Sequence, residues 1–143
     1  MAVFMLPIEV RFGACDPVGI VYFPRYFDWF HQAMEAWFGE ALGLPYHEVL
    51  TRHGFPAVHT EADYRRPCAF GDRVRVELRV GHIGSTSVRL DYRVIGPGRD
   101  ADLRATGHTV VVCFGTDPAA ADHLQAVALP PHIRAAVEAF AAR

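Results

Sequence analysis

The sequence predicts an α+β fold in which a five-stranded antiparallel sheet wraps around one long helix. Two patterns lead to this prediction. One segment repeats apolar residues at helical spacing, and several others alternate apolar and polar residues with the two-residue period of a strand. The 143 residues contain no internal repeat, low-complexity tract or domain-dividing linker, so we expect a single domain over residues 1–143.

The first strand is expected over residues 4–12, and a turn-rich stretch follows over residues 13–19. Pro24 is suited to open a helix, because proline is tolerated in the first helical turn. Residues 26–42 then read as a long helix with one apolar face. That face is formed by Phe27, Phe30, Met34, Trp37, Phe38 and Ala41. A shorter helical turn is expected over residues 46–52.

After this turn the period changes from 3.6 to 2. Residues 73–80 and 88–94 alternate valine, leucine or tyrosine with charged residues, which is typical of half-buried antiparallel strands. Residues 55–65 and 103–114 complete the set of five strands, and residues 131–142 predict a terminal helix. One sheet face then covers the long helix. The strand edges and the second face remain available, so we expect at least a dimer.

Composition excludes several classes of protein. Fourteen arginines are scattered among sixteen acids, and a net charge of −2 gives no broad attraction to nucleic acid or to an anionic membrane. No apolar run approaches the length of a membrane span, and no secretory signal is expected. Three widely spaced cysteines argue against disulfides, and the eight histidines show no metal-ligand spacing. We therefore expect a cytoplasmic protein that binds no metal.

The segment from Arg11 to Tyr26 carries the candidate chemistry. Asp16 lies in a loop bounded by glycine and proline, with apolar residues beyond it and a helix start further on. Apolar surroundings strip a carboxylate of water and make it a better nucleophile or base. Backbone N–H groups at a helix start can hold an oxygen on which negative charge develops. The competing interpretation is structural, because aspartate before proline also forms turns and helix caps.

This segment resembles the signature of the 4-hydroxybenzoyl-CoA thioesterase family of hot-dog-fold proteins. The matching positions are Asp16, Pro17, Gly19, Val21, Tyr22 and Tyr26. Residues 64–72 resemble a second, weaker family motif, and the similarity spans about residues 7 to 115. The resemblance implies a hot-dog domain, assembled as dimers or tetramers, that hydrolyses acyl-CoA to free acid and CoA. It implies no cofactor, because CoA is part of the substrate.

The resemblance also implies roles for individual residues. Asp16 corresponds to the catalytic aspartate, acting as nucleophile or general base, and the backbone N–H of Phe23 corresponds to the oxyanion donor. The candidate substrate-binding residues are Tyr22, His59, Arg65 and Arg66, with plain surface charge as the alternative for each arginine and a surface or satisfied histidine as the alternative for His59. The two arginines adjoin a strand end where they could reach CoA phosphates. His59 lies on a strand expected near the acyl site.

Three departures from the family pattern narrow the expectation. Ala14 replaces the first acid of the usual pair, and Phe23 replaces the histidine of the Tol–Pal-associated subgroup, which favours the aryl-CoA-like members and an aromatic acyl group. Residues 84–87 replace the basic run that some aryl-CoA thioesterases use for phosphate. The nucleotide must therefore meet other residues.

Two rival functions remain open. A hot-dog hydratase or dehydratase acting on acyl-thioesters pairs a histidine with an acid, but no histidine adjoins Asp16 in the sequence. A non-catalytic acyl-CoA-binding module could retain the fold without the activity. Glu35 on the long helix is a second candidate acid that also reads as a solvated surface residue. Cys15 lacks a nearby histidine to activate its thiol.

Overall fold

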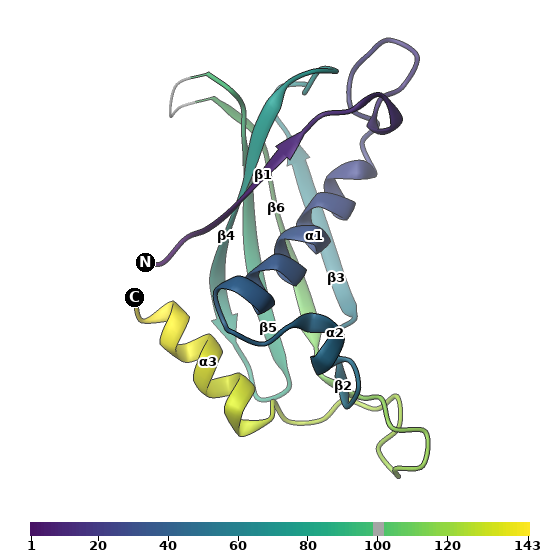
Figure 1. Cartoon of the computed structure of the whole chain (residues 1–143), viewed down its shortest axis with the longest axis vertical. Coiled ribbons are helices and arrows are strands. Elements are labelled where there is room, and N and C mark those ends of the chain that lie inside the picture. Colours follow the sequence, from purple (N-terminus) through teal and green to yellow (C-terminus); the bar gives the residue numbers. More distant parts are fainter. Residues whose placement is uncertain (99–101) are drawn as a thin grey trace.

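The computed structural model describes residues 1–98 and 102–143. Within them, five antiparallel strands form one sheet in the order β1-β4-β5-β6-β3, and helix α1 crosses one face of this sheet (Figure 1). The strands are β1 (Phe4–Glu9), β3 (Ala57–Tyr64), β4 (Arg73–Ile83), β5 (Ser87–Ile95) and β6 (Leu103–Val112). The predicted α+β fold, a five-stranded antiparallel sheet around one long helix, is confirmed.

Outside the main sheet, the longer elements are the helices α1 and α3, and the others are short. The helices of the described residues are α1 (Arg25–Glu40), α2 (Tyr46–Val49) and α3 (Pro131–Ala141), with a 3-10 turn, η1, at Phe12–Ala14. Two further strands, β2 (His53–Gly54) and β7 (Phe114–Gly115), pair with each other, and β7 also forms single bridges with Ala126 and His123. No helix in the described part of the chain combines the length and the apolar character needed to cross a bilayer.

Several element bounds differ from the prediction, and one pair of strands was not predicted. The first strand ends at Glu9 rather than at residue 12, because Phe12 already begins η1. Pro24 is the N-cap of α1 and not a residue of its first turn. The β2–β7 pair was not predicted, since two-residue strands contain no measurable alternation.

The core lies between α1 and the sheet. Phe30 of α1 is fully buried and stacks on Tyr92 of β5, with ring centroids 4.5 Å apart and planes 4° apart. Helix α3 covers the far end of α1, where Phe140 packs edge-on against Trp37 at 5.6 Å. The inward residues of β4 and β5 are the valines, leucines and tyrosine of the alternating pattern. Burial of this apolar surface is the main favourable contribution to folding.

The opposite face of the sheet is charged. Glu77 of β4 is nearly buried there, because Arg75 and Arg79 contact its carboxylate at 3.3 Å each and Arg93 of β5 approaches to 3.8 Å. The two-residue period of the strands therefore separates an apolar face under α1 from a polar outer face, as the sequence predicts.

Gly107 of β6 is required by close packing against α1. A Cβ at this position would lie 2.6 Å from Phe30 Cε2 and 2.6 Å from the Glu61 carbonyl oxygen. We expect Gly107→Ala to lower the free energy of unfolding by about 1–3 kcal/mol through overpacking. Gly39 of α1 is the matched control, since a Cβ there meets nothing within 4 Å, and Gly39→Ala should stabilise by about 0.5–1 kcal/mol. Urea unfolding of both variants tests the contrast, and equal midpoints would contradict it.

Candidate active site

The loop over residues 13–23 begins within η1 and leads to α1 at the upper end of the molecule in Figure 1. It is closed on itself by the Tyr22 N–H, which donates to the Ala14 carbonyl at 2.9 Å. It is also tied to the segment between β3 and β4, where the Val21 N–H donates to the Cys68 carbonyl at 2.9 Å. The Phe70 N–H donates back to the Gly19 carbonyl at the same distance. These contacts hold Asp16 and Phe23 on one braced loop.

Asp16 is half-buried and ordered by the loop itself. One carboxylate oxygen, Oδ1, accepts the Val18 N–H at 3.0 Å. This is the contact by which an aspartate before proline stabilises a turn. No other hydrogen bond to this carboxylate is formed within the described residues, so its second oxygen remains available to a ligand. Asp16 lines a hollow of about 370 Å³ whose walls include Phe12, Cys15 and Phe70.

Phe23 directly precedes the Pro24 N-cap, and its backbone N–H forms no hydrogen bond within the described residues. The next N–H groups along the chain are satisfied: that of Arg25 donates to the Tyr22 carbonyl at 2.9 Å, and that of Tyr26 donates to the Phe23 carbonyl at 3.2 Å. Phe23 therefore offers a free donor beside the positive end of α1, where an anionic oxygen is favoured.

A second hollow, of about 420 Å³, adjoins the first along the loop. Its lining residues are Ile20, Val21, Phe23, Tyr26, Tyr64, Arg65, Arg66 and Pro67. Arg66 pairs with Asp102 at 3.1 Å. The exposed Arg65 side chain forms no ion pair within the described residues. The fold thus brings three of the predicted site residues together, Phe23, Arg65 and Arg66.

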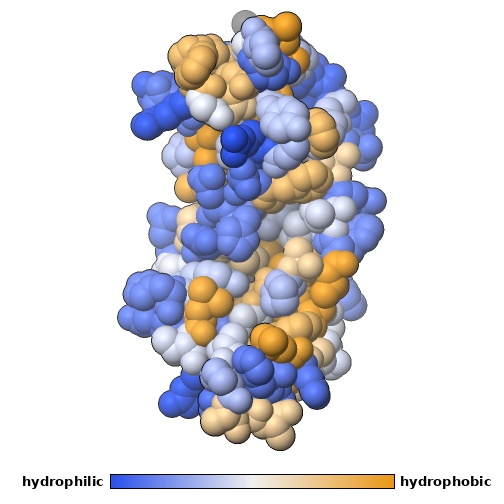
Figure 2. Space-filling view, turned by 90° about the vertical axis from the view of Figure 1, so that its right-hand side faces the viewer, coloured by the Kyte–Doolittle hydropathy of each residue, from blue (hydrophilic) through white to orange (hydrophobic). Residues whose placement is uncertain are grey.

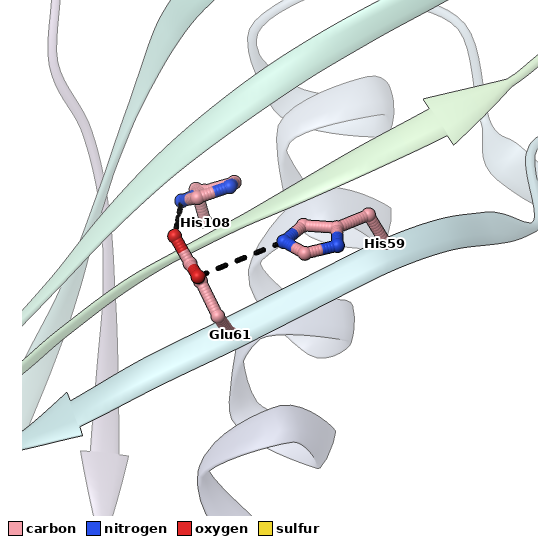
Figure 3. A group of neighbouring side chains, drawn as sticks. All are labelled: His59, Glu61 and His108. Carbon is pink, nitrogen blue, oxygen red and sulfur yellow. Dashed lines mark ion pairs between the residues drawn. The ribbon is translucent and has the colours of Figure 1, made fainter.

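The other predicted residues lie apart from this second hollow. Asp16 lines the neighbouring one, and Tyr22 is exposed with its ring 5.4 Å from that of Phe23 but lines neither hollow. His59 lies on the outer face of the sheet, away from α1, because strand alternation turns it there together with Glu61 (Figure 3). His59 lines neither hollow in one protomer, and its contact with the acyl group stays a prediction.

The two alternative nucleophiles gain no support from their surroundings. Glu35 pairs with His31 at 2.8 Å on the exposed side of α1, as a helix-surface acid does. The Cys15 thiol contacts the Arg11 carbonyl at 3.5 Å and forms no contact with a histidine among its hydrogen bonds.

Arg104 of β6 braces the site and was not identified from the sequence. Its guanidinium binds both carboxylate oxygens of Asp102, at 2.9 and 3.0 Å, and also donates to Asp72 Oδ2 at 3.2 Å and to the Pro67 carbonyl at 2.7 Å. Its own carbonyl accepts the backbone N–H groups of Arg65 and Arg66. Arg104 thereby fixes the end of β3, which carries Arg65 and Arg66. It also fixes the segment between β3 and β4, against which the Asp16 loop packs.

Two groups near Arg104 have shifted pKa values. The Arg104 guanidinium, together with the Gly98 N–H, lowers the pKa of Asp102 to about 2. Burial raises the pKa of the Tyr26 hydroxyl, which lies against Cys68 at the back of the second hollow. Tyr26 therefore stays neutral at physiological pH.

Asp102→Asn should lower stability in a pH-dependent way. Because the folded pKa lies below the ordinary value of 3.8, the carboxylate stabilises the fold above about pH 4, and this contribution is lost as the pH falls towards 2. We expect the variant to have a lower urea midpoint than the parent at neutral pH, and the gap to narrow between pH 4 and pH 2. A gap that stays constant across this range would contradict the assignment.

Comparison with known proteins identifies the family of this chain. The family model of the Thioesterase-like superfamily matches residues 10–137. A 1,4-dihydroxy-2-naphthoyl-CoA hydrolase of Synechococcus elongatus is 34% identical over 117 residues, covering 80% of this chain and 83% of the relative. The corresponding hydrolase of a Synechocystis strain is 30% identical over 115 residues, with the same coverage.

Solved structures show the same fold. A gentisyl-coenzyme A thioesterase superposes with a TM-score of 0.81 at 27% identity, covering 94% of this chain and 99% of the other. The 4-hydroxybenzoyl-CoA thioesterase of Pseudomonas sp. strain CBS-3 superposes with a TM-score of 0.82 at 22% identity, covering 95% and 99%, which is evidence of fold alone. The chain therefore belongs to the Thioesterase-like superfamily of hot-dog proteins and is a thioester hydrolase.

Proposed function

We propose that this chain hydrolyses an aromatic acyl-CoA, with Asp16 as nucleophile or general base and the Phe23 N–H as oxyanion donor. The observation that carries the proposal is the free Phe23 N–H at the start of α1, on the same braced loop as a half-buried carboxylate. The relatives named as acyl-CoA hydrolases support the choice of a CoA thioester.

The proposed reaction follows from these two groups. The thioester carbonyl oxygen accepts the Phe23 N–H, and this contact strengthens as negative charge develops on the oxygen. The Asp16 carboxylate either attacks the carbonyl carbon or removes a proton from the water that attacks it. The carbon–sulfur bond then breaks, and CoA leaves as a thiolate that takes up a proton. On the covalent route, water subsequently releases the acid from Asp16.

The walls of the second hollow support an aromatic acyl group. The Phe23 ring meets the Tyr64 ring edge-on at 6.3 Å, and the Tyr26 ring lies 5.1 Å from the same tyrosine. Flat rings bind well among such aromatic edges and faces. The curated relatives are named for a dihydroxynaphthoyl thioester, so a hydroxylated one- or two-ring acyl group is the substrate class that we propose.

We also propose that the chain acts as a homo-oligomer, a dimer or a tetramer. In one protomer Asp16 and Phe23 line different hollows. A single pocket that contains both residues would need side chains from a second protomer. Apolar side chains near the loop are exposed, with Phe12 at 77% and Val18 at 78%. Figure 2, which faces the β3 side of the molecule, shows hydrophobic residues at the upper end and in a band across the lower half. Such patches are typical of protein interfaces.

The test of the function is CoA release followed with a thiol-reactive dye. The panel contains 1,4-dihydroxy-2-naphthoyl-, 4-hydroxybenzoyl- and phenylacetyl-CoA beside acetyl- and palmitoyl-CoA. We expect the largest kcat/KM on a hydroxyaryl thioester. Release only from the aliphatic esters would overturn the aromatic assignment. Binding of all esters without any thiol release would favour the non-catalytic module.

Arg65 is proposed to contact a phosphate of CoA at the mouth of the second hollow. Since the contact is solvent-exposed, Arg65→Ala should raise KM by about twofold to fivefold and leave kcat nearly unchanged. Arg52→Ala is the control, because this exposed arginine lies near α2 and lines neither hollow. Steady-state kinetics on one aryl-CoA measures both variants, and an equal KM for Arg65→Ala and the parent would contradict the assignment.

A further inference from the structure

We infer that the outer face of the sheet carries a binding site for a transition-metal dication such as Zn²⁺, formed by His59, Glu61 and His108. Two neighbouring strands supply these ligands. His59 and Glu61 are two residues apart on β3 and therefore point to the same side, and the register places His108 of β6 directly opposite Glu61. Figure 3 shows the three side chains converging on the face turned away from α1.

The distances between the donor atoms suit one ion. His108 Nδ1 lies 3.0 Å from Glu61 Oε1, and His59 Nε2 lies 3.7 Å from Glu61 Oε2. One ligand atom from each of the three residues lies within 4.8 Å of the others. Tetrahedral zinc requires neighbouring ligand atoms about 3.3 Å apart. The exposed side chains of His59 and Glu61 can rotate by the small amount needed, whereas His108 is held at 14% exposure.

The three side chains together form a donor set that suits a metal ion. The two imidazole rings stack with centroids 5.3 Å apart and planes 28° apart. Each ring turns one nitrogen towards the Glu61 carboxylate, His59 through Nε2 and His108 through Nδ1 (Figure 3). Two histidines and one carboxylate form a common zinc donor set that leaves a fourth position for water.

The surrounding charges do not oppose a cation. The arginines of β5 that share this face are engaged by acids: Arg89 pairs with Asp91 at 2.8 Å, and Arg93 faces Glu77 at 3.8 Å. Glu61 and His108 also border a hollow of about 360 Å³, which gives the ligands access to solvent. An ion can therefore enter from water without displacing part of the core.

The site would fasten an edge of the sheet. Among the described residues β3 is an edge strand of the main sheet and pairs with β6, so a metal held by both strands cross-links the edge strand to its neighbour. An ion that binds the folded chain but not the unfolded chain stabilises the folded state by mass action. The cluster lies on the face away from α1, so metal binding and the proposed hydrolysis are tested independently.

The experiment is a calorimetric titration of ZnCl₂ into the chelator-stripped full chain at about pH 7.5, because metal affinity depends on pH. We expect saturable binding of one ion per chain and a higher melting temperature in the presence of zinc. His108→Ala and His59→Ala should each weaken binding by at least about tenfold. Circular dichroism of the metal-free variants checks that they are folded. Zinc affinity unchanged in both variants would overturn the site.

Two controls separate this site from other zinc ligands. His47→Ala removes an exposed histidine of α2 and should bind zinc as the parent does. Co²⁺ titration should give the visible spectrum of a tetrahedral nitrogen and oxygen site. A thiolate-to-cobalt charge-transfer band would instead assign the binding to a cysteine and overturn the proposal. His108→Ala should keep its thioesterase rate, because its side chain lies on the opposite face from the Asp16 loop.

Discussion

Replacing Asp16 with asparagine is expected to lower kcat by about 10²–10⁴-fold. The amide can neither attack a thioester nor accept a proton from water. Its Oδ1 can still accept the Val18 N–H that Asp16 accepts at 3.0 Å, so the loop should keep its shape. The measurement is thiol release from the best aryl-CoA of the panel, with KM and melting temperature determined on the same preparations.

Asp28→Asn is the matched control for this result. Asp28 is an exposed acid in the first turn of α1, paired with Arg25 at 3.3 Å, so its loss removes the same charge near the same helix start. We expect its kcat to stay within about twofold of the parent, as for a surface substitution away from the chemistry. Retention of most activity in Asp16→Asn, or an equal loss in both variants, would remove Asp16 from the mechanism.

Phe30→Ala is expected to lower the free energy of unfolding by about 3–5 kcal/mol. The Phe30 ring is fully buried and stacks on Tyr92 at 4.5 Å. It also fills the space over Gly107, which has no side chain of its own. Its deletion leaves a cavity between α1 and the centre of the sheet. The loss is measured by urea unfolding, with the slope of the transition used to confirm that the folded and unfolded states are unchanged in compactness.

Met5→Ala controls for the general effect of removing a large apolar side chain. Met5 lies exposed on the edge strand β1, so its truncation should change stability by no more than about 0.5 kcal/mol. If Phe30→Ala and Met5→Ala had similar urea midpoints, the packing of α1 on the sheet would contribute less to the free energy of unfolding than we expect.

The fold could be predicted because its elements carry strong periodic patterns. The alternation in β4 and β5 and the apolar stripe of α1 each specify one element and the face that it buries. The end of β1 could not be predicted, because residues 10–12 are apolar enough for a strand but the chain turns into η1 at Phe12. The alternation of apolar and polar residues does not show where the chain turns.

The site was only partly accessible to sequence reasoning. Asp16 and Phe23 are seven residues apart, and their short loop could be recognised as one segment. Arg104 and Asp102 could not be assigned a role, because they contact the region of Pro67 only after β6 has paired with β3. The grouping of His59 with His108 was missed for the same reason, since their separation along the chain of 49 residues carries no metal-ligand spacing.

The strand order has a consequence for the rate and sequence of folding. The β4–β5 and β5–β6 pairs join strands adjacent in the chain, whereas β1 pairs with β4 across a long separation, with Phe4 opposite Leu78. Distant pairings form slowly because a large loop must close first. We expect the β4–β6 meander to form early and the outer strands β1 and β3 to dock late. The loop that follows β1 and the arginines that follow β3 then meet only in the last step, so a partly folded chain has a sheet but lacks the proposed active site.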